Sequence, residues 1–314
     1  MNDSKSKILT KDDIKAYAKK CGFVDCGITD VSDFNDYKET IDRMLSSFPE
    51  TKHLYSSMEG KAYIKKNVPW AKSIIVCLRS YAKYKIPKTI KGYIGRNYLF
   101  DSRVLHSPEY QMSRNFTQYL KNSGIRVKKG GLPDRAAAKR AGVVSIGKNN
   151  FAFSKICGSW FNISTYIVDI ELKPDNPSVG TICPEGCDIC IRACPTKALS
   201  APYTMRMDKC IAFLTYGKEA EISEELCKKM GTWLYGCDVC QEVCPLNKGK
   251  WQNIVTLPYL EKVADIITPS KLSEMGQKTY EEIVFPLFNY IPVDRIDRWH
   301  NNAKRVLKYI KNNR

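Results

Sequence analysis

The chain has 314 residues, 50 Lys and Arg against 33 Asp and Glu, a net charge of +17, and 13 cysteines. That length suggests roughly two domains with a sizeable core. No apolar run reaches the ~18 residues of a membrane span, and the polar start MNDSKSKILTKDD does not fit a secretory signal. These features predict a cytoplasmic protein without membrane segments, in which clustered cysteines are metal ligands or redox groups rather than disulfides.

The large positive charge has two interpretations. It could keep the protein soluble, or it could attract an anionic partner, most often nucleic acid. Residues 80–98, SYAKYKIPKTIKGYIGRNY, interleave Lys and Arg with Tyr. Surfaces that contact a phosphate backbone and stack on bases have this composition. The charge by itself favours neither interpretation.

Helices and strands mix through the first part of the chain. Residues 10–22, TKDDIKAYAKKCG, have a capping Thr, two Asp in the first turn, an apolar stripe and a final Gly, which together predict a helix. Further patterns predict a buried strand at 73–78, helices at 107–124 and 133–142, and a longer alternating strand at 160–172. The mixture indicates an α/β or α+β domain.

The pattern changes near residues 172–186, where Pro, Gly and Cys become frequent. Short elements around cysteines are expected from there to residue 250, and helices after it. In the last of these, residues 294–311, the apolar side chains recur on one helical face. We therefore predict three parts, residues 1–175, 176–250 and 251–314.

Two cysteine runs dominate the middle part. CPEGCDICIRACP occupies residues 183–195, YGCDVCQEVCP occupies residues 235–245, and Cys210 lies between them. Bacterial ferredoxin runs give three thiolates to one 4Fe–4S cube and a fourth, just before Pro, to the other cube. By that logic the chain holds two crossed sets of four ligands. The first set is Cys183, Cys187, Cys190 and Cys244, and the second is Cys194, Cys210, Cys237 and Cys240.

A pair of zinc sites is the alternative, because zinc also takes four thiolates from C-x2-C knuckles. The proline after each run, the C-x3-C spacing and the crossed count of eight ligands favour two 4Fe–4S clusters. The first gap, from Cys183 to Cys187, is one residue longer than in the ferredoxin run, so Cys183 is the least secure ligand.

The order of several blocks resembles the epoxyqueuosine reductase family, which comprises cobalamin-dependent iron–sulfur enzymes that reduce an epoxide on a modified tRNA base. The blocks are LPDRAAAKRAG, SIGKNN, GSWF, CDICIRACPTKAL, DKCIAFLTYG and YGCDVCQEVCPLN, and the resemblance covers roughly residues 60–250. It implies an α+β fold, in which a nitroreductase-like cobalamin-binding domain is followed by a double-cluster ferredoxin-like module and a short helical C-terminus.

The resemblance also implies a base-off cobalamin. By matching position, the residues near the corrin would be Arg96, Ala152, Ile163, Ala212, Cys237 and Asp238. None of the three His fits the Asp-x-His-x-x-Gly motif of another corrinoid class, which agrees with a site that lacks a His ligand.

The chain departs from the family at the proton donor. The family has an Asp just before LPDRAAAKRAG, where this chain has Lys128, and the family's GRDYH is GRNYL at 95–99. Cleavage of a carbon–oxygen bond needs an acid for the leaving oxygen. Our hypothesis is that Tyr98, aided by Lys128, donates this proton. Asp134 is a further candidate, although a helix-start charge is its simpler role.

Three functions remain open at this stage. The first is reduction of epoxyqueuosine in tRNA, with a reduced ferredoxin or flavodoxin as electron donor and the chain acting as a monomer. The second is reduction of a small molecule, as in the related reductive dehalogenases, which the change to Lys128 favours. The third is a non-catalytic protein that transfers electrons or activates a corrinoid, which would need clusters but no acid.

Overall fold

The computed structural model describes residues 9–100, 103–105, 107–217 and 222–313. The chain divides into two compact units. The first unit comprises residues 1–80, 111–147 and 151–184, and the second comprises 81–110, 148–150 and 185–314. Residues 1–8, which include most of the polar start that argued against a secretory signal, lie outside the described residues. The three predicted parts, 1–175, 176–250 and 251–314, stay a prediction.

A four-stranded antiparallel sheet forms the centre of the first unit. Its strand order is β1 (Asp25–Thr29), β2 (Ser73–Ser80), β6 (Phe161–Val168) and β3 (Val127–Lys129). The predicted strand at 73–78 is confirmed as β2, whereas the one predicted at 160–172 ends at Val168. Beyond that residue the chain leaves the ladder, and Leu172 N–H donates to Ser73 Oγ at 2.9 Å.

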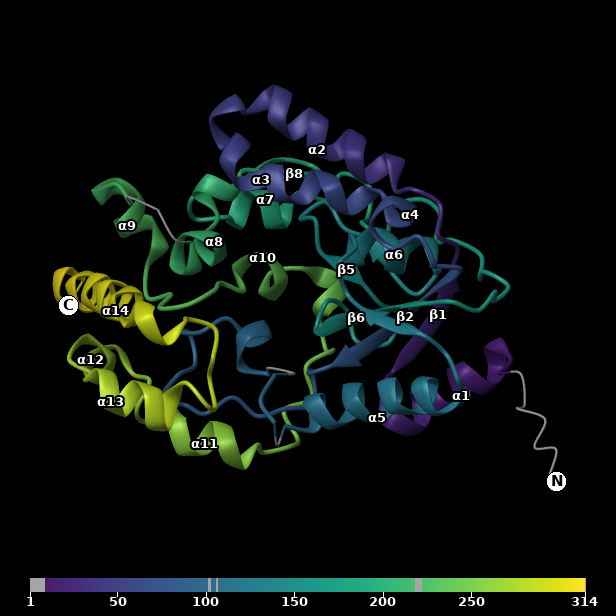
Figure 1. Ribbon diagram of the computed structural model, residues 1–314. Helices are drawn as coiled ribbons and strands as arrows, with labels where there is room; N and C mark the ends of the chain where they lie inside the picture. Colours follow the sequence, from purple (N-terminus) through teal and green to yellow (C-terminus); the bar gives the residue numbers. More distant parts are fainter. Residues whose placement is uncertain (1–8, 101–102, 106, 218–221, 314) are drawn as a thin grey trace. The chain divides into compact units, whose positions relative to one another are not determined.

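Two helices cover one face of this sheet. They are α1 (Lys11–Cys21) and α5 (Pro108–Asn122), which Figure 1 shows along the same side of the strands. Ile14, Phe116 and Tyr166 are fully buried between the helices and the strands. The predicted boundaries of α1 are confirmed, because Thr10 and Asp13 form a capping box and Gly22 ends the helix at φ 104°.

Helix α6 (Asp134–Arg140) packs on the opposite face. Ala137 and Ala138 are fully buried there, and small side chains let the helix lie close to the strands. A Cβ atom at Gly27 of β1 would come within 2.3 Å of the Ala141 carbonyl oxygen, so this contact requires Gly. The hairpin of β4 (Ser145–Ile146) and β5 (Ala152–Phe153) completes the strands of this unit.

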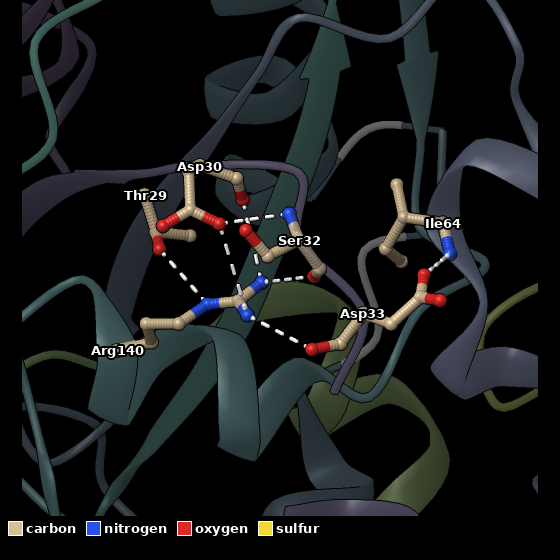
Figure 2. A network of polar contacts seen from close by, with 6 residues as sticks. All are labelled: Thr29, Asp30, Ser32, Asp33, Ile64 and Arg140. Carbon is tan, nitrogen blue, oxygen red and sulfur yellow. Dashed lines mark hydrogen bonds and ion pairs between the residues drawn. The ribbon is translucent and has the colours of Figure 1, made fainter. Parts of the chain in front are cut away.

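Sequence patterns did not predict α2 (Asn35–Ser47), α3 (Lys52–Glu59) and α4 (Ile64–Asn67). The loop that leads into α2 is held by Arg140, as Figure 2 shows. Its guanidinium donates to Thr29 Oγ1 at 3.1 Å and to the carbonyl oxygens of Asp30, Ser32 and Asp33 at 2.9–3.3 Å. The group also lies 3.7 Å from the centroid of the Phe34 ring.

The second unit consists of short elements around the cysteines followed by helices. They are the 3-10 turn Arg96–Leu99, α7 (Ile189–Ala193), β7 (Leu199–Ala201), β8 (Thr204–Met205), α8 (Ile211–Tyr216), α9 (Glu224–Met230), α10 (Val239–Glu242), α11 (Pro258–Ala264), α12 (Pro269–Ser273), α13 (Gln277–Thr279) and α14 (Ile296–Asn312). The final helix agrees with the predicted one, and its Trp299, Ala303 and Val306 are fully buried.

Residues 80–98, in which Lys and Arg alternate with Tyr, lie only partly at the surface. Tyr81 and Tyr84 are each 1% exposed and stack on Phe100 with ring centroids 5.3 and 4.7 Å apart. The prediction that these tyrosines form a base-stacking surface is therefore wrong, because they belong to the core of the second unit. Lys85, Lys88 and Lys91 are exposed and remain available to an anionic partner.

Within the described residues, no helix combines the length and the apolar character that crossing a membrane requires.

The Arg140 contacts predict a specific cost. Arg140→Lys keeps the positive charge, but a single ammonium group cannot donate to all four oxygen atoms that the planar guanidinium reaches. We therefore expect the free energy of unfolding to fall by about 2 kcal/mol. Urea denaturation followed by circular dichroism measures this. Arg192→Lys is the matched control, because that side chain is 71% exposed and pairs with Asp188. Equal stability of the two variants would show that the Arg140 contacts do not hold the loop.

Candidate iron–sulfur centre and reductase site

Four of the predicted ligands lie together in the second unit. Cys194 follows α7, Cys210 precedes α8, and Cys237 and Cys240 lie on either side of the first residue of α10. A buried cluster that includes Cys190 and Cys194 packs against Cys210 and Cys240. The thiols of Cys237 and Cys240 are also close enough to those of Cys194 and Cys210 to interact electrostatically. The structure thus places Cys194, Cys210 and Cys240 of the second set, together with Cys190 of the first, in one cluster, and Cys237 in the apolar cluster of Ile211 and Leu214.

Two of these four sulfur atoms lie where the thiolate form needs a bound cation. Burial raises the pKa of the Cys237 and Cys240 thiols well above the usual value, and neighbouring cysteines raise it further. A metal ligand must be a thiolate, so a bound cation has to stabilise the charge that the protein disfavours. None of the 13 cysteines, all within the described part of the chain, forms a disulfide.

The first set of ligands is less completely described. Cys190 is 8% exposed on α7, while Cys183, Cys187 and Cys244 are half-buried. Cys183 belongs to the first unit and the other three belong to the second. Helices α7 and α10 contact each other, which places the two cysteine runs side by side within the second unit. The grouping of this first set stays a prediction.

The described residues contain no three His, Cys, Asp or Glu side chains close enough to hold one metal ion. A zinc site needs four ligands around a single ion at about 2.0–2.3 Å. In a 4Fe–4S cube each thiolate binds a different iron, so the sulfur ligands stand further apart.

Residues 148 and 149, from the SIGKNN block, hold the cysteine loops through their backbones. Lys148 Nζ donates to the Cys187 carbonyl oxygen at 2.8 Å, and Asn149 Nδ2 donates to that of Cys240 at 3.2 Å. The Lys148 carbonyl oxygen in turn accepts from Tyr203 N–H at 2.8 Å. The sequence pattern gave this block no role of its own, although its Lys and Asn side chains were an available signal.

The C-terminal helix α14 holds the second ligand set from another direction. Asn302 Nδ2 donates to the Thr215 carbonyl oxygen at 2.9 Å, and Thr215 Oγ1 accepts from Gly236 N–H at 2.9 Å. Arg305 donates to the carbonyl oxygens of Gly231, at 3.0 Å, and Trp233. One helix therefore ties the segment after Cys210 to the segment before Cys237. These residues were not predicted, because backbone contacts of this kind leave no periodic pattern.

The GRNYL segment docks directly on the second cysteine run. Ile94 and Tyr235 form a parallel bridge, and Gly95 N–H donates to the Tyr235 carbonyl oxygen at 2.8 Å. A Cβ atom at Gly95 would lie 2.9 Å from Cys237 N, so the close approach depends on Gly. Arg96 N–H donates to Asp238 Oδ2 at 2.8 Å. The structure therefore brings Arg96 together with Cys237 and Asp238, three of the predicted corrin contacts.

Asp238 carries a buried carboxyl group at this junction. The residue is 2% exposed, and burial raises its pKa to about 7, although the Arg96 backbone and side chain act in the opposite direction. Arg96 itself pairs with Glu242 at 2.6 Å and lies over the Trp251 ring at 4.7 Å. The Arg96 side chain is thus held on two sides.

Tyr98 lies edge-on against two aromatic rings. Its ring centroid is 5.0 Å from that of Tyr235 and 5.4 Å from that of Tyr290. A Cβ atom at Gly236 would come within 2.3 Å of the Tyr98 ring, so Gly236 makes room for it. Tyr98 belongs to the second unit and Lys128 to the first. Their predicted cooperation stays a prediction.

The remaining predicted site residues of the first unit share one sheet face. Lys128 pairs with Ile167 on β6, and Ile163 and Thr165 point to the same face because side chains alternate along a strand. Asp134 reaches this face, since its Oδ1 accepts from Thr165 Oγ1 at 2.7 Å. The structure therefore gathers Lys128, Asp134 and Ile163 on the α6 side of the sheet.

The Asp134 residue is exposed to solvent, but enough protein lies around its carboxyl group to change its pKa. Burial raises its pKa, while the Thr165 hydrogen bond and the charges of Lys61 and Arg135 act in the opposite direction. A carboxyl group that stays protonated to higher pH is a candidate general acid. The other two predicted corrin contacts, Ala152 and Ala212, are small residues that are buried and half-buried, respectively.

The crossed ligand sets predict the effect of one substitution. In Cys244→Ala we expect the cluster of Cys183, Cys187 and Cys190 to be lost, while the cluster of Cys237 and Cys240 remains. Iron analysis and electron paramagnetic resonance of the anaerobic protein follow the two clusters, with Cys237→Ala as the reciprocal variant. Loss of the same cluster in both variants would show that the sets are not crossed.

The α14 contacts predict a second effect. Arg305→Met removes two charge-assisted hydrogen bonds to carbonyl oxygens, which we expect to cost about 3 kcal/mol of local stability. Chelator-induced loss of cluster absorbance should therefore be faster than in the unaltered protein. Lys308→Met is the matched control on the same helix, because its side chain is 68% exposed. Equal rates for Arg305→Met and Lys308→Met would show that α14 does not hold the cluster loops.

Comparison with known proteins agrees with this geometry. Residues 183–247 match the family described as a 4Fe-4S double cluster binding domain. The epoxyqueuosine reductase of Staphylococcus aureus is 32% identical over 252 residues, which is 76% of this chain and 65% of the relative. The epoxyqueuosine reductase of Leadbetterella byssophila is 31% identical, with 75% of this chain and 79% of the relative covered.

A solved structure of an epoxyqueuosine reductase with an epoxyqueuosine-modified tRNA-Tyr stem loop is also similar. The TM-score is 0.79 at 28% identity, and the match covers 96% of this chain and 81% of the other. The similarity thus extends over the cysteine runs and the α+β unit alike. The chain belongs to the epoxyqueuosine reductase family.

Proposed function

We propose that this chain reduces the epoxide of epoxyqueuosine in tRNA. The observation that carries the proposal is the match over 96% of the chain to a reductase solved with a modified tRNA stem loop. The net charge of +17 suits a polyanionic substrate, and the exposed lysines of residues 85–91 offer phosphate contacts. The match covers 65% of the S. aureus relative, so the shared activity remains our proposal.

The cofactors of the proposal are two 4Fe–4S clusters and a base-off cobalamin. When bound, the cobalamin supplies the electrons that break the carbon–oxygen bond. Ala152 and Ile163 offer small or apolar surfaces that suit the flat ring, and Arg96 is held by Asp238 and Glu242 at the second cysteine run. The cysteine thiolates hold the iron, and the surrounding backbone contacts keep their loops in place.

A proton must reach the oxygen that leaves the epoxide carbon, and we propose that Asp134 supplies it. Its carboxyl group has a raised pKa, it shares a sheet face with Lys128 and Ile163, and Thr165 orients it. A carboxylic acid donates to an alkoxide more readily than a phenol or an ammonium group does, since its pKa is lower. Tyr98 aided by Lys128, the donor predicted from sequence, is the competing assignment.

The remaining parts of the proposal follow from the family. We propose a cytoplasmic monomer that receives electrons from a reduced ferredoxin or flavodoxin. Reduction of a small molecule is the second candidate function, and the observation that favours it is Lys128 at the position of the family's catalytic Asp. Turnover of a modified tRNA stem loop distinguishes the two candidates.

Three single variants test the activity and the donor together. We expect turnover of an epoxyqueuosine-modified stem loop by the unaltered protein, a loss of roughly 10²–10⁴-fold in Asp134→Asn, and little change in Lys128→Met. Because the acid form is required, kcat should fall as pH rises through the raised pKa of Asp134, and Asp134→Asn should abolish that limb. Iron content shows whether each variant is folded.

The outcomes separate the alternatives. Robust activity in Asp134→Asn together with a large loss in Tyr98→Phe would overturn our assignment and favour the Tyr98 donor. No turnover of the stem loop by cobalamin-loaded, iron-replete protein would overturn the tRNA substrate and favour the small-molecule function.

A further inference from the structure

Arg96, one of the predicted corrin contacts, is held by a tryptophan that the sequence patterns did not predict. The guanidinium carbon of Arg96 lies 4.7 Å from the centroid of the Trp251 ring, and its Nη2 atom lies 2.6 Å from Glu242 Oε1. The backbone N–H of Arg96 donates to Asp238 Oδ2 at 2.8 Å. All four residues belong to the second unit. The Arg96 side chain is 18% exposed, so a ligand can still reach it.

Trp251 reaches Arg96 because the residues that follow it pair with the segment that leads into GRNYL. Tyr84 and Val255 form a parallel bridge, and backbone hydrogen bonds of 2.7–2.8 Å join the same two segments. The Trp251 ring also packs against the ring of Tyr81, with centroids 6.1 Å apart, and Tyr81 is 1% exposed. Backbone pairing and a buried neighbour therefore fix the place of the tryptophan ring.

The two carboxylates near Arg96 restrain its guanidinium less than the ring does. The Glu242 side chain is 43% exposed, and water weakens an ion pair at such a position. Arg96 Nε lies 3.9 Å from Asp238 Oδ2, which is too far for a hydrogen bond. A guanidinium that lies over an aromatic face is attracted to the ring, and this contact restricts the orientation of its plane. Trp251 therefore contributes to the orientation of the Arg96 donors.

On the basis of the proposed function, we propose that Trp251 is a positioning residue that orients Arg96 in the cobalamin site. Cobalamin carries amide groups around its ring and a phosphate in its nucleotide loop, and the N–H groups of a guanidinium suit both. Trp251 acts through Arg96 and needs no contact of its own with the cofactor. Its ring should therefore affect cobalamin affinity only while Arg96 is present.

Titration of the anaerobic, iron-replete protein with cob(II)alamin, followed by absorbance, tests the positioning role. We expect the affinity to be about tenfold weaker in Trp251→Leu and in Arg96→Met, and to recover in Trp251→Phe, which keeps a ring face for the guanidinium. The double variant Arg96→Met/Trp251→Leu should bind as Arg96→Met does, because the tryptophan acts through the arginine. Iron content shows whether each variant is folded.

Trp70→Leu is the matched control in the first unit. It removes another tryptophan that lies against an arginine, since the guanidinium carbon of Arg126 is 4.3 Å from the Trp70 ring centroid. Neither residue is among the predicted corrin contacts, so the cobalamin affinity should equal that of the unaltered protein.

The remaining outcomes separate this inference from the proposed function. Unchanged affinity in Trp251→Leu, equal losses in Trp251→Leu and Trp251→Phe, or a further loss in the double variant would overturn the positioning role and leave the proposed function intact. Absence of cobalamin binding by the unaltered protein would overturn both. If Arg96→Met does not keep its iron, the comparison of Trp251→Leu with Trp251→Phe carries the test.

Discussion

The second unit buries cysteine thiols whose ionised form it cannot stabilise by itself. Burial raises the pKa of Cys237 and Cys240, and the nearby thiols of Cys194 and Cys210 add to the effect. A buried thiol with a raised pKa becomes a thiolate ligand only when a cation offsets the cost of its charge. A metal cluster bound at these cysteines would therefore add to the stability of the loops that hold it, beside the apolar residues packed around them.

The surrounding polar contacts act on the backbone of the cysteine loops and leave the sulfur atoms available. Lys148 and Asn149 bind carbonyl oxygens of Cys187 and Cys240, while Asn302 and Arg305 hold the segments next to Cys210 and Cys237. These contacts restrain the backbone on both sides of the candidate ligands. The docking of Gly95 on Tyr235 attaches the GRNYL segment to the same loop, so Arg96 keeps a set position relative to Cys237.

The elements predicted from sequence were those with a local signal, such as a helix cap, a terminal Gly or a periodic apolar pattern. Helix α1 has a capping box and a terminal Gly, β2 is a continuous apolar run, and α14 has an apolar face. Helix α2 was missed because Phe34 at its N-cap offers no side-chain hydrogen bond and no Gly ends it. The bridge between Ile94 and Tyr235 joins residues far apart in sequence, and such a contact leaves no periodic pattern.

In the candidate site, too, local motifs predicted some residues, whereas properties that depend on tertiary contacts were missed. Ferredoxin-like spacing selected Cys194, Cys210, Cys237 and Cys240, and the structure places three of them in one cluster, while their role as iron ligands stays a prediction. The raised pKa of Asp134 depends on which residues surround its carboxyl group, so no motif could reveal it. Tyr81 and Tyr84 looked like surface residues because Lys and Arg surround them in sequence, yet their rings pack on Phe100 in the core.

We propose that two 4Fe–4S clusters, each bound by four cysteines, form the electron path of this chain. Anomalous diffraction at the iron edge from anaerobically grown crystals tests it most directly. We predict two separate iron sites, one of them surrounded by Cys194, Cys210, Cys237 and Cys240. A signal at the zinc edge from isolated ions at these cysteines, with none at the iron edge, would contradict the claim.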